Sequence, residues 1–233
     1  MRTQKNATVT VVYRWSMLDN SHLPEKYKQE IIATHHGNLA KRFIDGLFAP
    51  VGIGSFDYDS VIHERKYIEL NALQSVVYGV DFGWTNPSAI VAVGFDSDGR
   101  AYILDEFYQN RTQTETLIQE LKEMLMQFGQ GRIICDRSAP ATIDMLRSAG
   151  LNAVADESKR DDGIRELGGR FVVQGDGKPR IFVASKCVNL IHEAMVYNSE
   201  IKENDHAIDA LRYAIMSVVT VKPDVEPAWV FGD

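Results

Sequence analysis

Three apolar segments follow one another between residues 75 and 108, and they limit the possible folds more than any other pattern in the chain. Their sequences are SVVYGVDFG (75–83), SAIVAVGF (88–95) and AYILDEFY (101–108). Apolar runs of this length are typical of strands buried within a sheet. The connection from Asp96 to Gly99 predicts a tight turn, because Asp and Gly favour turn conformations. The pattern therefore predicts an antiparallel meander of three strands.

Helices and strands alternate after this meander. Residues Thr112–Glu115 fit a capping box, and Gly129 would end the helix that follows. The further elements are expected to be a strand at 132–136, a helix at 139–150, a strand at 152–156, a short helix at 164–167, a hairpin (RFVVQ and RIFVA) with its tip at Asp176-Gly177, and helices at 186–197 and 205–221. This order predicts an α/β fold: one mixed sheet with helices on both faces and an added β-hairpin.

Residues 1–70 follow a different pattern. They predict a strand at Thr8–Arg14, a helix from Pro24 to Gly37 and a short helix at Asn38–Asp45, without the strand–helix alternation of a complete α/β domain. We therefore expect a connector in residues 1–70 and a separate domain in residues 71–233.

The composition excludes several classes of protein. The 45% hydrophobic and 24% charged residues are typical of a globular chain, and no apolar run approaches the roughly 20 residues that span a bilayer. The net charge of −7 argues against a protein that coats nucleic acid, although it allows an enzyme with a local basic surface. Cys135 and Cys187 indicate reduced core thiols in a cytosolic protein.

Acidic residues stand at the ends of several predicted elements. Asp81 ends the first strand of the meander, and Asp136 ends the strand at 132–136. Ligands bind beyond the strand ends of open α/β sheets, so these two side chains would meet if their strands are parallel neighbours. On the last helix, Asp205 and Asp209 are four residues apart and His206 lies three before Asp209, so each pair can share a face.

Such a cluster of carboxylates requires compensation. Two carboxylates about 5 Å apart repel each other by roughly 3 kcal/mol at an effective dielectric near 20. Divalent cations would relieve this repulsion, and two metals bridged by a carboxylate are an arrangement that cleaves phosphodiesters. Simpler interpretations remain: Glu106 as a solvated charge at a strand end, Asp205 as a helix N-terminal acid, and His206 as a structural residue.

A basic segment provides a possible DNA contact. Between residues 159 and 186, seven basic residues (Lys159, Arg160, Arg165, Arg170, Lys178, Arg180 and Lys186) stand against four acidic ones (Asp161, Asp162, Glu166 and Asp176), a local net charge of +3. The predicted hairpin tip with Lys178 could touch the DNA backbone or gate a cleft. A solvated basic face explains the same pattern.

Three segments together resemble a known family. They are GVDFGWTNPSAIVAV (79–93), CDRSAP (135–140) and NDHAIDALRYA (204–214). In this order they are similar to the nuclease domain of the large terminase subunit of tailed bacteriophages, over about residues 70–220. The resemblance implies a ribonuclease H-like fold and metal-dependent endonucleolytic cleavage of double-stranded viral DNA during packaging. Residues 1–70 resemble the end of that family's ATPase region, and the chain contains no GxxxxGK[ST] phosphate loop.

The resemblance also implies roles for individual residues. Asp81 would bridge two Mg²⁺ or Mn²⁺ ions, Asp136 and Asp209 would complete the acidic site, and His206 would be an auxiliary ligand or proton carrier. Asp205 is a further candidate ligand. One metal would activate the attacking water and the other would stabilise the leaving 3′ oxygen. The side chains expected to contact DNA phosphates are Lys159, Arg160, Lys178, Arg180 and Arg137, the last of which departs from the family pattern and could instead fill space.

The implied context is the host cell cytoplasm, with DNA, the packaging ATPase domain, the small terminase subunit and the portal as partners and no membrane. Three alternatives stay open. A resolvase or transposase type of nuclease would share the fold and the metal site. A sugar-kinase or actin-like ATPase would need a second domain. A catalytically silent docking module would neither bind Mn²⁺ nor cut DNA.

Overall fold

The structure is a computed structural model that describes residues 15–34, 42, 44–46, 56–197 and 205–219. The chain divides into two compact units, Met1–Val51 and Gly52–Asp233. The segment from residue 56 to residue 70 thus packs with the second unit, whereas the sequence pattern placed a boundary near residue 70. The predicted strand Thr8–Arg14 and most of the predicted helix Asn38–Asp45 lie outside the described residues.

The first unit contains a short 3-10 helix, η1 (Met17–Asp19), and α1 (Glu25–Thr34). Ser16 begins η1 with a capping box, in which its hydroxyl and the Asp19 carboxylate each accept a backbone N–H. Helix α1 begins directly after Pro24, as predicted, because Pro favours the first turn of a helix.

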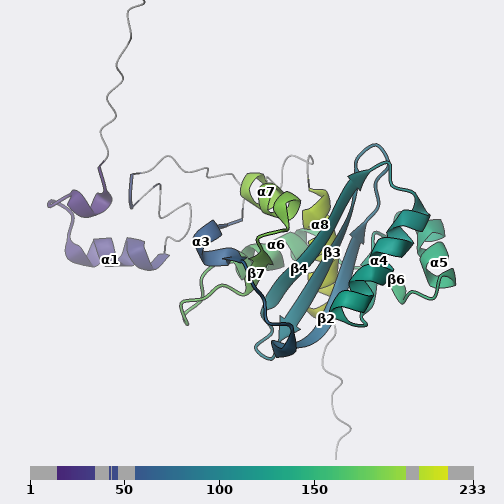
Figure 1. Cartoon of the computed structure of the whole chain (residues 1–233). Helices are drawn as coiled ribbons and strands as arrows, with labels where there is room; N and C mark the ends of the chain where they lie inside the picture. Colours follow the sequence, from purple (N-terminus) through teal and green to yellow (C-terminus); the bar gives the residue numbers. More distant parts are fainter. Residues whose placement is uncertain (1–14, 35–41, 43, 47–55, 198–204, 220–233) are drawn as a thin grey trace, which may run out of the picture. The chain divides into compact units, whose positions relative to one another are not determined.

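The second unit is built on one mixed sheet (Figure 1). Among the described residues it has seven strands in the order β1-β7-β4-β3-β2-β5-β6. Strands β2, β3 and β4 form the predicted antiparallel meander, and the other neighbours pair in parallel. The strand bounds are β1 Glu64–Arg65, β2 Leu73–Asp81, β3 Pro87–Asp96, β4 Ala101–Asn110, β5 Arg132–Cys135, β6 Ala153–Ala155 and β7 Ile181–Ala184.

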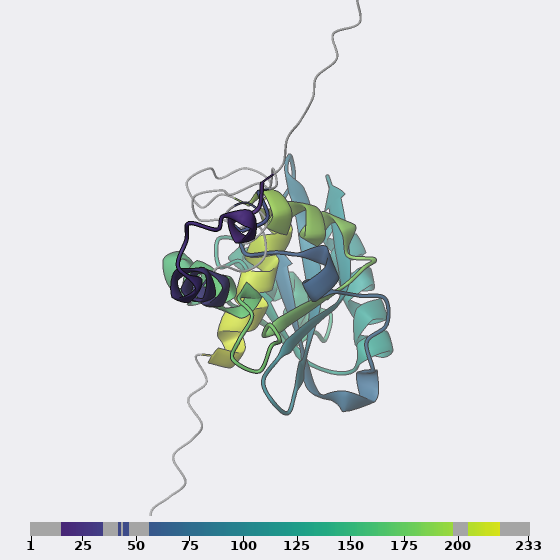
Figure 2. The same cartoon turned by 90° about the vertical axis from the view of Figure 1, so that its left-hand side faces the viewer.

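Helices cover both faces of this sheet, as predicted (Figures 1 and 2). One apolar core joins the sheet to α6, α7 and α8, and a second joins the opposite face to α4 and α5. Helix α8 packs on the central strands β2 and β3 and also contacts α6 and α7. The short helices α3 (Ser60–His63) and η2 (Leu70–Ala72) precede β2. The helix bounds are α4 Thr114–Phe128, α5 Pro140–Ser148, α6 Arg160–Phe171, α7 Val188–Val196 and α8 His206–Val219.

Side-chain alternation along β2 decides which residues face α8. Val77 belongs to the core on the α8 face, whereas Tyr78 and Val80 belong to the core under α4 and α5. Gly79 has the same orientation as Val77, and a Cβ atom there would lie 1.8 Å from the carbonyl oxygen of Ala210. Gly79 therefore allows α8 to approach the strand that carries Asp81.

The predicted β-hairpin is wrong in its first arm. Residues Arg170 and Phe171 end α6, because Leu167 and Phe171 place a buried stripe on one face of a longer helix. Strand β7 also has no free edge for such an arm, since β4 and β1 pair with its two sides. The turn itself is present: Gln174 donates its N–H to the Lys178 carbonyl, and Gly177 has a φ of 77°.

The predicted start of the helix after the meander is corrected. The capping box at Thr112–Glu115 does not form, because α4 begins at Thr114 with Gln113 as its N-cap, and the Thr112 hydroxyl donates to the Gln109 carbonyl instead. Among the described helices, none combines the length and the apolar character that crossing a bilayer requires.

Candidate functional site

Asp81 and Asp136 lie at the same edge of the sheet. Asp81 is the last residue of β2, and Asp136 directly follows β5, which pairs with β2 in parallel. The Asp136 N–H donates to the Val80 carbonyl at 3.0 Å, so the backbone fixes the two acids on adjacent strands. The Asp136 carboxylate also accepts hydrogen bonds from the backbone N–H and the hydroxyl of Ser138. The predicted convergence of these two positions is confirmed.

Helix α8 brings three more predicted residues to this edge. The His206 ring bonds the Asp81 carboxylate through Nδ1 at 3.0 Å. Asp205 precedes the helix, and its carbonyl accepts the N–H of Asp209 at 2.7 Å. Asp209 lies one turn into α8 and lines a pocket at this edge, which is described below. The N-terminus of α8 is thus directed at the C-terminal end of β2.

The charges of Asp136 and Asp209 act on Asp81. Burial raises the pKa of Asp81 to about 6, and the charges of Asp209 and Asp136 add to this effect, while the hydrogen bond from His206 opposes it. The same hydrogen bond raises the pKa of His206. Burial together with the charges of Asp81, Asp209 and Asp136 raises the pKa of the Tyr213 phenol. The charges of all three carboxylates therefore act on Tyr213.

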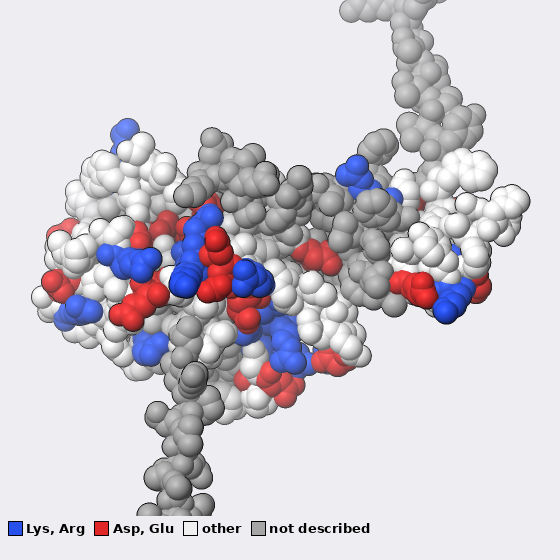
Figure 3. All heavy atoms as spheres, turned by 180° about the vertical axis from the view of Figure 1, so that it is seen from behind, with Lys and Arg blue, Asp and Glu red and all other residues white. Residues whose placement is uncertain are grey.

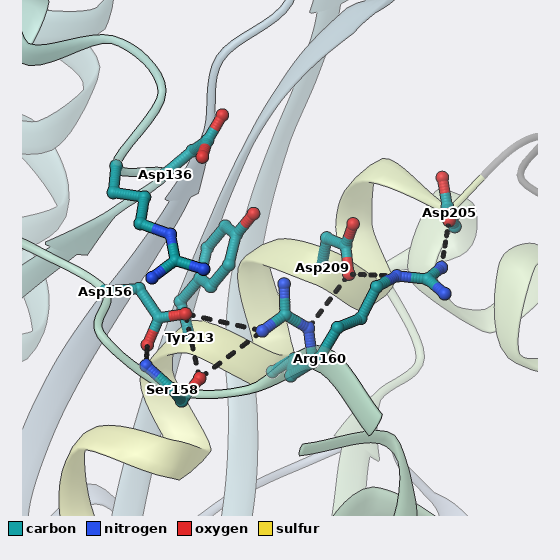
Figure 4. A pocket seen from close by; sticks show the side chains of 9 residues that line it. Asp136, Asp156, Ser158, Arg160, Asp205, Asp209 and Tyr213 are labelled. Carbon is teal, nitrogen blue, oxygen red and sulfur yellow. Dashed lines mark hydrogen bonds and ion pairs between the residues drawn. The ribbon is translucent and has the colours of Figure 1, made fainter. Parts of the chain in front are cut away.

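A polar pocket of about 350 Å³ opens beside these acids (Figure 4). Asp136, Asp205 and Asp209 line it together with Arg160 from α6. The Arg160 guanidinium donates to the Asp205 carboxylate at 2.7 Å and lies 3.9 Å from Asp209. Arg160, predicted as a DNA contact, is thus engaged with the acidic residues.

Arg212 is a second cation in this pocket, and its guanidinium is buried. Its Nε donates to Asp209 Oδ1 at 3.0 Å. Its Nη1 lies 3.3 Å from Asp156 Oδ2 and 3.4 Å from the Ser158 hydroxyl. Burial raises the pKa of Asp209, and the charge of Arg212 and its hydrogen bond to that carboxylate partly oppose this effect.

Glu193 fixes the start of α8 from the α7 side. It is 2% exposed, and its carboxylate accepts the backbone N–H of Ile208 at 3.0 Å and the Tyr108 hydroxyl at 2.7 Å. A carboxylate at a helix N-terminus satisfies N–H groups that have no partner within the helix. Burial raises the pKa of Glu193 to about 7.

The predicted phosphate-binding residues do not form one surface. Arg137 is exposed and lines the pocket, and exposed Lys159 is the N-cap of α6 beside it. Lys178 and Arg180 lie in the loop before β7, at the opposite edge of the sheet, because β7 runs parallel to β4 and hence in the direction of β2. Arg180 there donates to the Asp98 carbonyl in the β3–β4 turn.

The surface charge agrees with this separation. On the face shown in Figure 3, Lys and Arg side chains are interspersed with Asp and Glu side chains rather than forming a continuous basic area. The basic segment at 159–186 is thus divided between the two ends of the strands, and its basic charges are partly paired, as in the contacts of Arg165 with Asp162 and of Arg170 with Glu166.

Glu106 has a structural role rather than a place in the pocket. It lies within β4, which continues to Asn110. Its carboxylate accepts the backbone N–H groups of Asn189 and Leu190 at 2.7 and 2.8 Å, at the start of α7. It also accepts the Asn189 side-chain amide at 2.9 Å. This residue caps α7 and is not a solvated strand-end charge.

In this structure, arginines bind the carboxylates that line the pocket: Arg160 binds Asp205, and Arg212 binds Asp209. Among the described residues, no group of three or more His, Cys, Asp or Glu side chains is arranged to hold a metal ion. Arg212, Asp156 and Glu193 were not singled out from the sequence. The spacing of Asp209 and Arg212, three residues apart on a helix, was a usable signal for the first of them.

Comparison with known proteins identifies the fold and the family. The family model "Terminase RNaseH-like domain" matches residues 78–218. The PBSX phage terminase large subunit of Bacillus subtilis (strain 168) is 24% identical over 218 residues, which are 84% of this chain and 48% of that protein. This chain therefore spans about half the length of that relative.

Solved structures have the same fold. The large terminase of a thermophilic bacteriophage superposes with a TM-score of 0.63 at 21% identity, over 88% of this chain and 54% of that one. The nuclease domain of the bacteriophage SPP1 large terminase g2p, solved with bound Mn, gives 0.54 at 22% identity, over 67% of this chain and 96% of that one. The mixed sheet is thus a ribonuclease H-like fold, and the chain belongs to the terminase RNase H-like domain family.

Proposed function

We propose that this chain is a divalent-metal-dependent endonuclease that cleaves double-stranded DNA during the packaging of a viral genome. The observation that carries the proposal is the convergence of acids from three elements: Asp81 and Asp136 lie at the ends of adjacent parallel strands, and the charges of Asp136 and of Asp209 on α8 both raise the pKa of Asp81. Family membership supports a nuclease, and the SPP1 domain with bound Mn supports metal use.

The donor set fits hard divalent ions. Mg²⁺ and Mn²⁺ prefer carboxylate oxygens, and buried acids that repel one another are stabilised by cations. Asp81, Asp136 and Asp209 would hold the ions, and Asp205 would add a ligand once Arg160 releases it. Ions held there supply Lewis acidity, which favours ionisation of a water and neutralises charge on the phosphate.

The remaining side chains would orient and contact the substrate. His206 would keep a proton on Nδ1 and donate a hydrogen bond from it to the Asp81 carboxylate, which fixes the orientation of that carboxylate. Arg137 and Lys159, exposed at the pocket, would bind phosphate oxygens without reading bases. Arg160 would exchange Asp205 for a phosphate. Lys178 and Arg180 precede β7, at the other end of the strands, and are not part of this surface.

The wider context of the proposal comes from the relatives. The PBSX protein and the thermophilic phage protein are large terminase subunits, and this chain covers about half of each. We propose that it works with a packaging ATPase domain, a small terminase subunit and a portal, and that residues 1–70 connect it to the ATPase region. Site choice on DNA would come from those partners.

The test is cleavage of supercoiled plasmid by the full chain in Mn²⁺ or Mg²⁺, with EDTA as the blank. Asp81→Asn keeps the shape of the side chain and should reduce nicking by roughly a hundredfold or more, because it removes a principal ligand charge. Asp144→Asn is the matched control, since Asp144 is an exposed carboxylate on α5 that pairs with Arg147. Its nicking rate should equal that of the parent.

Two results would contradict the proposal. Equal cleavage by Asp81→Asn and the parent would place the active site elsewhere. A parent chain that binds DNA but nicks it in neither metal would instead favour the docking module.

A further inference from the structure

We propose that Arg212 is a positioning residue, which, anchored on Asp156, orients the Asp209 carboxylate for metal binding. This inference rests on the proposed function, because it assigns Asp209 to the metal site. It concerns two residues, Arg212 and Asp156, that are not among the proposed metal ligands.

Arg212 joins α8 to the loop after β6 through one guanidinium. Nε binds Asp209 Oδ1 one turn earlier on α8 at 3.0 Å. Nη1 reaches the loop after β6, where Asp156 Oδ2 and the Ser158 hydroxyl lie 3.3 and 3.4 Å away. The planar group also lies over the Tyr213 ring, 4.3 Å from its centroid. A planar fork of donors can satisfy several fixed acceptors at once, which an ammonium group cannot.

The anchor is itself fixed to the sheet. The Asp156 N–H donates to the Cys135 carbonyl at 2.8 Å, and Cys135 is the residue before Asp136. The Asp156 carboxylate accepts the backbone N–H of Ser158 at 3.1 Å and the Ser158 hydroxyl at 2.8 Å. Arg212 therefore ties Asp209 on α8 to the strand end that carries Asp136.

The fold provides a dedicated space for this side chain. The Arg212 side chain is 5% exposed, and that of Asp156 is 9% exposed. Gly163 of α6 lies against it, and a Cβ atom there would come within 2.5 Å of Arg212 Cγ and 2.7 Å of Cδ. A larger residue at 163 would displace the arginine.

Arg160 is a different kind of partner. Its side chain is 27% exposed, and it lies 3.9 Å from Asp209. In Figure 4 the interactions of Asp209 among the residues drawn all involve one of its two oxygens. Arg212 and Arg160 thus both approach Oδ1, so Arg160 can leave while Arg212 still holds Asp209.

Charge and geometry predict opposite effects on metal binding, so they can be separated. If Arg212 only offset the charge of Asp209, its replacement in Arg212→Gln would tighten Mn²⁺ binding, because a nearby cation repels the metal. If Arg212 orients Asp209, even a charge-conserving replacement weakens binding. Positioning groups of this kind typically change metal affinity by about 10–100-fold.

The experiment measures Mn²⁺ binding to the full chain by electron paramagnetic resonance, together with kcat and KM on plasmid DNA. Arg212→Lys keeps the charge but loses the fork, and we expect its Kd for Mn²⁺ to rise about tenfold. We also expect kcat to fall while KM for DNA stays constant, since the Arg212 side chain is buried and would act through Asp209. Arg165→Lys is the control, because Arg165 is an exposed arginine on α6 paired with Asp162.

A second variant covers the case in which Arg212→Gln fails to fold. Asp156→Asn should weaken Mn²⁺ binding in the parent chain but add no further loss in the Arg212→Lys chain, because it acts through Arg212. An unchanged Kd in Arg212→Lys, tighter Mn²⁺ binding in a folded Arg212→Gln chain, or additive losses in the double variant would each overturn the inference. A parent chain without Mn²⁺ binding would overturn the proposed function along with it.

Discussion

At the residue scale, the buried carboxylate of Glu193 links the stability of the fold to the position of the site residues on α8. Glu193 is almost fully buried, yet it is not one of the proposed ligands. Its carboxylate accepts the Ile208 N–H and so fixes the first turn of α8, which carries His206 and Asp209. Ionising a buried acid is unfavourable, and burial accordingly raises its pKa to about 7. The fold therefore accepts an unfavourable charge where it fixes the start of the helix.

The stability of the chain should depend on pH through Glu193. The folded pKa of Glu193 is about 7, above the ordinary 4.5. The contribution of this residue to the free energy of unfolding is therefore fully present below pH 4.5 and is lost as the pH rises through 7. Glu193→Gln removes this loss. Relative to the parent, the variant should gain up to about 3 kcal/mol of unfolding free energy between pH 4 and pH 8 in EDTA, measured by urea denaturation. A pH-independent difference would contradict this.

Glu106 offers a contrasting test, because its carboxylate caps α7. Glu106→Ala leaves two backbone N–H groups at the start of α7 without their partner, which should cost about 1–2 kcal/mol of unfolding free energy. The nicking rate per folded molecule should stay at the parent value. Cleavage that falls as far as in Asp81→Asn would instead assign Glu106 to the active site.

Single residues differ in how far the sequence predicts them. Asp81 and Asp136 could be placed at one edge because apolar strands locate their own ends. The helix face grouped Asp209 with Asp205 and His206, and its place beside the two strand acids was implied by the family resemblance. The Arg212–Asp156 contact joins residues 56 positions apart, so no local pattern reports it. Arg160 was predicted as a DNA contact from its charge alone, since only the fold reveals Asp205 beside it.

At the scale of elements, the packing of α8 on β2 decides whether the site forms. The two elements carry His206 and Asp81, and Gly79 sets the distance between them because its Cα lies under the Ala210 carbonyl. An ordinary side chain in this position would separate helix and strand.

Gly79→Ala should therefore damage both stability and activity. The added Cβ would meet the Ala210 oxygen at 1.8 Å, so α8 must shift, at a cost of about 1–3 kcal/mol or more. Nicking should fall in the remaining folded protein, because His206 moves away from Asp81. Gly168→Ala is the matched control: Gly168 lies in α6 with open space around it and should gain about 0.5–1 kcal/mol. Equal thermal stability of the two variants would refute the close packing.

Elements were predictable where one rule was sufficient. The meander follows from apolar runs and a tight turn, and α8 follows from its periodicity. The first arm of the hairpin failed because RFVVQ has apolar residues suited to a strand, whereas Phe171 also continues the buried stripe of α6. Tertiary contacts decided between the two, since β1 and β4 already occupy both sides of β7.

At the scale of the whole molecule, the segment before β2 is part of the second unit, Gly52–Asp233. Phe56 stacks on Phe171 and Tyr197, with ring centroids 4.9 and 4.6 Å apart. His63 is buried and bonds the Phe171 carbonyl through Nε2 at 2.8 Å. Polar residues surround these aromatic positions in the sequence, and the segment lacks strand–helix alternation, so the pattern predicted a connector up to residue 70.

A chain of residues 71–233 should consequently be far less stable than one of residues 52–233. The shorter chain lacks Phe56, Tyr58 and His63 from the core, together with the edge strand β1. Removing one large buried aromatic side chain typically costs about 3–5 kcal/mol, and whole domains are stable by only about 5–15 kcal/mol. We expect cooperative thermal unfolding, followed by circular dichroism at 222 nm, for residues 52–233 and no cooperative transition for residues 71–233. Melting temperatures within a few degrees of each other would show that the aromatic segment is dispensable, and would place the domain boundary near residue 70 after all.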